Sequence, residues 1–88
     1  MPTIDYIWAD QALTVIQELP RQPYTGERIR WIILDRGLQE PPHHNHWGML
    51  IKMAIDYDLL IPTGRYEPMQ EPSSHGRRTE IYMIPIAR

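Results

Sequence analysis

The residues whose chemistry stands out first are the histidines. Three of the four, His43, His44 and His46, fall within one short stretch, and His75 lies far along the chain. Imidazole is a common zinc ligand, but two ligands on one helix need an i, i+4 spacing. His43 and His44 are adjacent instead, and no carboxylate shares their turn. The spacing therefore argues against a metal site, and we expect no metal or other cofactor.

A second group that could do chemistry is the run Ser73-Ser74-His75, which places hydroxyls next to an imidazole. A catalytic nucleophile needs its base within hydrogen-bonding reach and a third group that orients the base. Adjacent residues of a turn-rich loop rarely adopt that geometry, and no orienting acid is apparent. We expect no catalytic residues, so the chain is predicted not to be an enzyme.

The histidine-rich stretch leads into a predicted helix over residues 46–57. The proline pair at 41–42 cannot continue a helix, and Asn45 is a natural N-cap, worth ~1 kcal/mol relative to alanine. Gly48, in the first turn, lowers the stability of the helix by up to ~1 kcal/mol relative to alanine. A glycine at such a position often indicates that another backbone or a ligand comes close. The helical period predicts that one face packs and the other is exposed. The packing residues are Trp47, Leu50, Ile51 and Ala54, and the exposed ones are His46, Met49, Lys52, Met53 and Asp56.

Two more helical patterns precede this stretch. Apolar residues recur every three or four positions through residues 4–19, which predicts an amphipathic helix with Thr3 or Asp5 near its N-cap. Residues 27–36 form the second predicted helix, with Thr25 as N-cap and a glycine just beyond its end. Each predicted helix holds one tryptophan: Trp8, Trp31 and Trp47. Because indole rings bury large apolar areas, we expect the last two in the core.

After the third helix the pattern becomes that of strands. Residues 59–84 predict a long hairpin that contains a short β-prone run, a bend at Thr63-Gly64, a turn-rich loop and an alternating strand at 79–84. Pro62 restricts the first strand to an edge or an end of the sheet. The predicted fold is mostly α with a small β-hairpin (α+β), with three helices followed by two strands in one domain of residues 1–88.

Composition limits what the chain can be. Its 88 residues can build one hydrophobic core, and without cysteine it has neither a disulfide framework nor a thiolate zinc site. The sequence begins without a basic and apolar leader pattern, and no apolar run approaches the ~20 residues that a membrane span needs. We therefore expect a soluble, cytoplasmic protein with no membrane partner.

The charge distribution gives a mixed signal for nucleic acid. A net charge of −2 and a pI near 6.0 do not favour DNA binding in bulk. The first twenty residues hold acidic side chains and no lysine or arginine, whereas Arg65, Arg77 and Arg78 flank one late segment. The two ends of the domain are expected to present different faces.

The order of three helices and a two-stranded hairpin resembles a winged-helix domain. The runs Asn45-His46-Trp47-Gly48, 60–66 and 72–77 are also similar to a pattern in small, poorly characterised phage and prophage proteins. Those proteins share an Asn-x-Trp-Gly helix start, a Thr-Gly strand exit and a Ser-His-Gly-Arg loop. The likeness covers residues 25–84 and leaves the first helix uncovered.

This resemblance implies a small, regulatory, phage-related protein whose partner is double-stranded DNA. The third helix would read the major groove, and residues 65–79 would form a wing on the phosphates or the minor groove. The implied DNA-binding residues are His44, Asn45, His46, Met49 and Lys52 on the helix, and Arg65, Ser73, Ser74, His75, Arg77 and Arg78 on the wing. A helix with one lysine, followed by Asp56 and Asp58, binds phosphate poorly alone, so we expect it to depend on the wing arginines.

A function of another class stays open. The same fold would serve as a protein-interaction module, an adaptor or inhibitor of a nucleic-acid-processing or host-defence complex. The acidic balance and the pair Met49 and Met53 motivate this alternative, because methionine side chains adapt to varied partners. A homodimer through the first helix is compatible with both functions.

Overall fold

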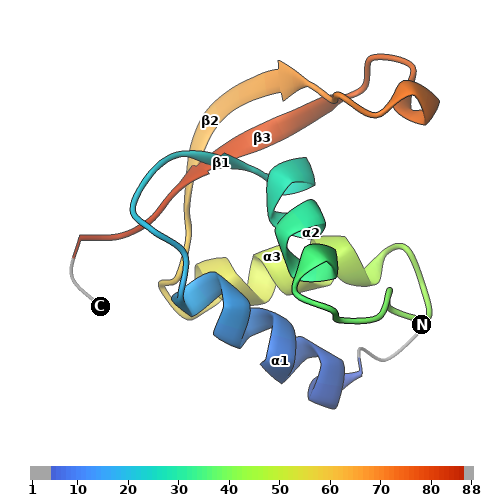
Figure 1. Ribbon diagram of the computed structural model, residues 1–88. Helices are drawn as coiled ribbons and strands as arrows, with labels where there is room; N and C mark the ends of the chain where they lie inside the picture. Colours follow the sequence, from blue (N-terminus) through green and yellow to red (C-terminus); the bar gives the residue numbers. More distant parts are fainter. Residues whose placement is uncertain (1–4, 87–88) are drawn as a thin grey trace.

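A computed structural model describes residues 5–86 and shows an α+β fold in which three helices lie against a small antiparallel sheet (Figure 1). The elements are α1 (Tyr6–Gln17), β1 (Tyr24–Thr25), α2 (Gly26–Asp35), α3 (His46–Asp56), β2 (Ile61–Pro68), the 3-10 turn η1 (Pro72–Ser74) and β3 (Arg78–Met83). The α+β class is thereby confirmed. The expected order of three helices followed by two strands misses β1, because two residues are too short to show an alternating pattern.

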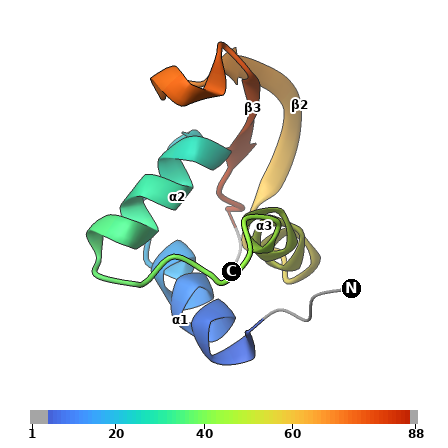
Figure 2. The ribbon, with the colours of Figure 1, turned by 90° about the vertical axis from the view of Figure 1, so that its right-hand side faces the viewer.

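The hydrophobic core lies between the three helices and one face of the sheet. α1 contacts α2 and α3, and α2 contacts β1 and β3 (Figure 2). The rings of Trp8 and Trp47 meet edge to face with their centroids 5.1 Å apart, so the prediction that Trp47 belongs to the core is confirmed. The same prediction for Trp31 is wrong, since its side chain is 38% exposed. Ile29 and Ile33 occupy the core side of α2. Trp31 is two positions from Ile29 and therefore lies on the other side of the helix.

Local capping signals set the helix starts. Asp5 Oδ1 accepts hydrogen bonds from the Ile7 and Trp8 amides at 3.0 and 3.2 Å, which begins α1 at Tyr6. The alternative cap, Thr3, and the expected start at residue 4 lie outside the described residues. Thr25 Oγ1 accepts from the Arg28 amide at 3.0 Å, which confirms the predicted cap of α2.

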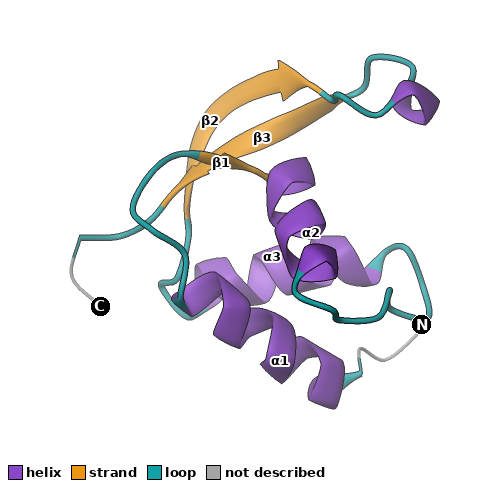
Figure 3. Ribbon diagram, viewed as in Figure 1, coloured by secondary structure: helices purple, strands orange, loops and turns teal. Residues whose placement is uncertain are grey.

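The sheet has the order β1-β3-β2, so β2 is an edge strand, as Pro62 predicts (Figure 3). Pro62 pairs with Tyr82 and Tyr66 with Glu80, so the three residues 63–65 face a single residue of β3. The Thr63-Gly64 bend is therefore a bulge inside the strand. The Thr63 hydroxyl and the Glu80 carboxylate accept the amides of Arg65 and Gly64, both at 3.1 Å, which satisfies donors that the bulge leaves without a strand partner. Of the helices in residues 5–86, none has the length and apolar character to cross a membrane.

Candidate nucleic-acid interface

A hollow of about 460 Å³ separates the start of α3 from the β2–β3 hairpin. Three segments line it. The α3 side contributes His44, Trp47, Gly48 and Ile51, α2 contributes Gly26, Glu27, Ile29 and Arg30, and the hairpin side contributes Tyr66, Met69, Arg77, Arg78, Thr79, Glu80 and Tyr82. We call this hollow the inner groove. It brings together two segments that the sequence separates by about thirty residues, the tip of the third helix and the arginines of the hairpin.

The inner groove carries two cationic side chains that are free of ion pairs. Arg77 and Arg78 are exposed, and neither forms a salt bridge with any residue in 5–86. The backbone of Arg77 is held in place, since its amide donates to the Ser74 carbonyl at 3.1 Å and its carbonyl accepts from Met69 at 2.6 Å. Guanidinium groups on a fixed backbone are well suited to bind phosphate oxygens.

The carboxylates near the groove already have hydrogen-bond donors. Glu27 is 4% exposed, and its oxygens accept the backbone amides of Gln70 at 2.7 Å and Glu71 at 3.1 Å. Glu80 accepts the Gly64 amide, as described above. Neither carboxylate forms a salt bridge within the described residues, so Arg77 and Arg78 keep their charge available to a ligand.

The far end of the hairpin is fastened to α2. In addition to the Glu27 hydrogen bonds, Arg30 forms a salt bridge with Glu71 at 2.5 Å, and the Ser74 hydroxyl donates to the Glu71 carbonyl at 2.6 Å. Figure 2 shows η1 on the α2 side of the hairpin. The hairpin end is therefore positioned by α2 as well as by the sheet.

The tip of α3 differs from its prediction in two respects. Asn45 precedes the helix, but its backbone is already helical and its side chain makes no capping hydrogen bond. His46 is 1% exposed, so the expectation that it lies exposed at the tip is wrong. Its ring turns inward against the His43 ring, with 5.4 Å between the centroids, and neither ring nitrogen of His46 has a hydrogen-bond partner among the described residues.

The remaining α3 candidates are divided between the surface and the core. His44 is exposed and lines the inner groove, and Lys52 is exposed farther along α3. Met49 and Met53 are half-buried and pack against the core, so their predicted place on the exposed side of the helix is wrong. Gly48 lines the groove, and a Cβ added there would meet no atom within 4 Å. The bare backbone at Gly48 therefore has no packing role inside the protein.

The hairpin candidates are also divided. Arg65 and Arg78 lie on opposite faces of the sheet, because Arg65 lines a hollow with Ile81 and Met83 whereas Arg78 lines the inner groove with Tyr82. Ser73 lines a neighbouring hollow of similar size, about 480 Å³, between α2 and the hairpin end. His75 is exposed in a left-handed conformation with φ of 53°, and Ser74 is 5% exposed, so its side chain is not available to a ligand. The structure thus groups Arg77 and Arg78 with His44, and sets Arg65 apart.

Sequence patterns did not point to three residues that shape this region. Glu27 lies in the first turn of the predicted second helix, where an acidic residue is common, yet it holds the hairpin from 43 residues away. Arg30 and Glu71, 41 residues apart, carry no local signal. Within residues 5–86, no group of three or more histidine and acidic side chains is arranged to hold a metal ion.

Comparisons with known proteins leave the family open. No protein-family model and no solved structure matches this chain. The chain is similar to a stretch of actin-regulating kinase 1 from Saccharomyces cerevisiae, with 29% identity over 68 residues. That stretch covers 76% of this chain and 11% of the kinase, so the chain spans a small part of the relative it matches. At this identity and coverage the likeness does not assign a family.

Proposed function

We propose that this chain is a winged-helix DNA-binding protein in which α3 is the recognition helix and the β2–β3 hairpin is the wing. The observation that carries the proposal is the position of Arg77 and Arg78. These two arginines, free of ion pairs within residues 5–86, lie across one groove from the first turn of α3. A groove with a helix start on one side and free cations on the other suits a duplex whose bases meet the helix while its phosphates meet the hairpin.

The exposed tip of α3 supplies groups that suit base edges. The Asn45 side chain, which makes no capping hydrogen bond, is free to bond an adenine through both its oxygen and its nitrogen. His44 is exposed beside it. Gly48 lines the inner groove with no side chain, so that a sugar-phosphate backbone can approach the helix closely there. His46 and Met49 take no part in the proposed contact, because their side chains turn toward the core.

The proposed DNA contact depends on the hairpin. The chain has a net charge of −2, and Lys52 is the one lysine in its sequence. Phosphate contacts supply most of the non-specific affinity for DNA, so a helix tip without strong cations gains little from the backbone by itself. Arg77 and Arg78 supply that contribution, and the α2 contacts of Glu27 and Arg30 hold the hairpin in place.

The proposal is tested by the salt dependence of DNA binding. The full chain is titrated into a fluorescently labelled pool of mixed-sequence duplexes, and anisotropy is measured at several salt concentrations. We expect the logarithm of the affinity to fall linearly with the logarithm of salt concentration, by about 0.9 for each neutralised phosphate. Absent binding, or binding that salt does not weaken, would contradict the proposal.

Other features of the proposal stay predictions. They are a regulatory, phage-related role, a cytoplasmic location and a homodimer through α1, which light scattering would test. The alternative function is a protein-interaction module. One observation that supported it no longer does, because Met49 and Met53 pack against the core. A different observation supports it, a hollow of about 870 Å³ on the opposite face of the sheet.

A further inference from the structure

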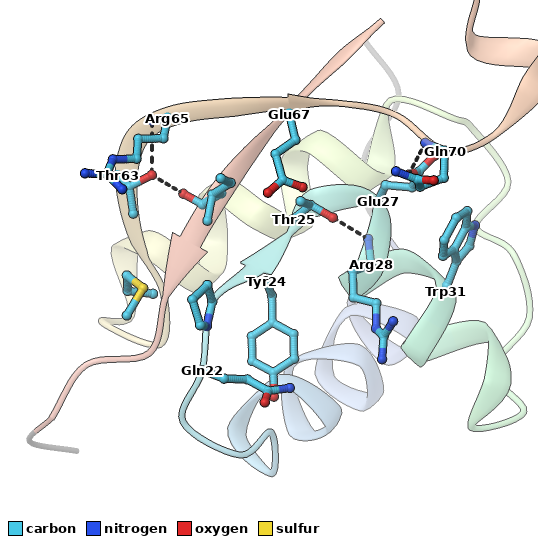
Figure 4. Close-up of a pocket in the computed structure, with 13 residues that line it drawn as sticks. Gln22, Tyr24, Thr25, Glu27, Arg28, Trp31, Thr63, Arg65, Glu67 and Gln70 are labelled. Atoms are coloured by element: carbon cyan, nitrogen blue, oxygen red, sulfur yellow. Dashed lines mark hydrogen bonds between the residues drawn. The ribbon is translucent and has the colours of Figure 1, made fainter. Parts of the chain in front are cut away.

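The face of the sheet that is turned away from the inner groove forms a larger hollow, of about 870 Å³ (Figure 4). β2 arches over it, β1 and the first turns of α2 form its lower wall, and Gln70 closes one end (Figure 4). We call this hollow the outer trough. Its volume falls in the range of ~300 to 1,000 Å³ that ligand sites occupy. Arg77, Arg78 and α3 do not line the outer trough. Glu27 and Trp31 do, and they also line hollows that contain His44 and Arg77.

The outer trough combines an apolar anchor with charges of both signs. The Trp31 indole lies at one end of the trough. It is 38% exposed, on the side of α2 that faces away from the core. Arg28 and Arg65 come from opposite walls, and neither forms a salt bridge within residues 5–86. Glu67 extends from β2 into the space between the walls, also without a salt bridge among the described residues (Figure 4). A half-exposed tryptophan near unpaired arginines is typical of binding hot spots.

We propose that the outer trough binds an extended acidic segment of a partner protein. The two unpaired arginines are complementary to aspartate or glutamate side chains, and the Trp31 indole to an apolar side chain of the same segment. Glu67 selects a peptide over a nucleic acid. A phosphate backbone has no donor to offer the Glu67 carboxylate, whereas a peptide backbone has an N–H group at nearly every residue. The small domain would thereby join a protein on one face to DNA on the other.

The probe is a library of random linear peptides from which binders to the immobilised full chain are selected. We expect the selected peptides to be rich in aspartate and glutamate with an apolar residue among them. Binding is then followed by the NMR signal of the Trp31 indole N–H, assigned from a Trp31→Phe variant. A shift of this signal, with the signals of the buried Trp8 and Trp47 unchanged, is the expected response.

Two matched variants decide whether the selected peptides bind the outer trough. Arg65→Gln removes one charge from the trough, and Arg77→Gln with Arg78→Gln removes charge from the inner groove. All three side chains are exposed, so both variants should keep the fold. We expect Arg65→Gln to weaken peptide binding by about tenfold, in the range of hot-spot losses, and the double variant to leave it unchanged. Selection of no binder or of basic peptides, or equal peptide affinity for Arg65→Gln and the wild-type chain, would overturn the proposal, whatever the outcome for DNA.

Discussion

Glu27 Oε1 accepts a hydrogen bond from the backbone amide of Gln70 at 2.7 Å, which joins the first turn of α2 to the far end of the β2–β3 hairpin. The second oxygen of the same carboxylate accepts the Glu71 amide. Because the carboxylate is almost fully buried, no solvent replaces these bonds when they are lost. The hairpin that carries Arg77 and Arg78 is thereby held at a defined position relative to the helices.

Glu27→Gln should therefore destabilise the protein and loosen the hairpin. The amide side chain keeps one acceptor and turns a donor toward the other backbone N–H, and an unsatisfied buried donor costs about 1 to 3 kcal/mol. We expect urea titration to show a free energy of unfolding lower by that amount, with faster hydrogen exchange at Gln70 and Glu71. Glu40→Gln changes an exposed carboxylate and should stay within about 0.5 kcal/mol of the wild-type chain. Equal effects of the two substitutions would show that the Glu27 bonds contribute nothing.

His46→Leu should stabilise the protein. The imidazole is 1% exposed and neither of its nitrogens has a partner among the described residues, so it bears a desolvation cost without a compensating hydrogen bond. Removing such a group should raise the free energy of unfolding by about 1 kcal/mol or more. His44→Leu, at an exposed imidazole, is the control and should change little. A loss of stability in His46→Leu would mean that the imidazole makes a favourable interaction, such as one with a bound water.

Stability should fall at alkaline pH because of Tyr82. Burial, helped by the negative charge of Glu80 and by Tyr66, raises the pKa of the Tyr82 phenol from 10 to about 12. The folded state then keeps a proton that the unfolded chain loses, so this contribution is complete below pH 10 and is lost as the pH rises toward 12. Denaturation at a series of pH values should show this decline, and Tyr82→Phe should flatten it. Tyr57→Phe, at an exposed phenol, should leave the decline as it is in the wild-type chain.

Gly48→Ala separates stability from DNA binding. A Cβ at Gly48 meets open space, so alanine should raise the free energy of unfolding by up to ~1 kcal/mol through its higher helix propensity. The same methyl group would stand in the inner groove and should weaken DNA binding. Gln11→Ala on the exposed side of α1 should leave DNA affinity unchanged. A Gly48→Ala protein that gains stability and binds DNA as tightly as before would argue against close approach of DNA to this turn.

Arg77→Ala combined with Arg78→Ala should lower both DNA affinity and its dependence on salt. If two phosphate contacts are lost, the slope of log affinity against log salt concentration should be less steep by about 1.8. Arg65→Ala is the control, because it removes one arginine charge from the opposite face of the sheet and should leave the slope unchanged. If Arg65→Ala flattens the plot as much as the double variant, the duplex does not lie in the inner groove.

Features that depend on neighbouring residues could be predicted from the sequence. Thr25 caps α2 as expected, and Asp5, one of two caps expected for the first helix, caps α1, because a cap needs only a side-chain oxygen and the amides two or three residues later. The same local reasoning fails at Asn45, whose backbone is already helical and whose side chain makes no capping hydrogen bond. Pro62 places β2 at a sheet edge for an equally local reason, since proline has no N–H group to donate.

Features that depend on tertiary packing could not be predicted from the sequence. Ile29 and Ile33 occupy the side of α2 that faces the core, so Trp31 is exposed despite its size. His46 was assigned to the surface by the helical period, yet it is 1% exposed and its ring lies against that of His43 in the preceding loop. Arg65 and Arg78 were grouped because both flank the hairpin loop, and only the pairing register places them on opposite faces.

The position of DNA on the surface is tested most directly by an NMR titration of the isotopically labelled full chain with a short duplex. We predict that backbone amide signals of His44, Asn45, Gly48, Arg77 and Arg78 shift together, while those of Arg28 and Arg65 in the outer trough stay in place. Shifts confined to the outer trough, or no shifts at duplex concentrations above the ~10⁻⁴ M at which even weak non-specific DNA binding is seen, would contradict the assignment of the inner groove as a DNA-binding site.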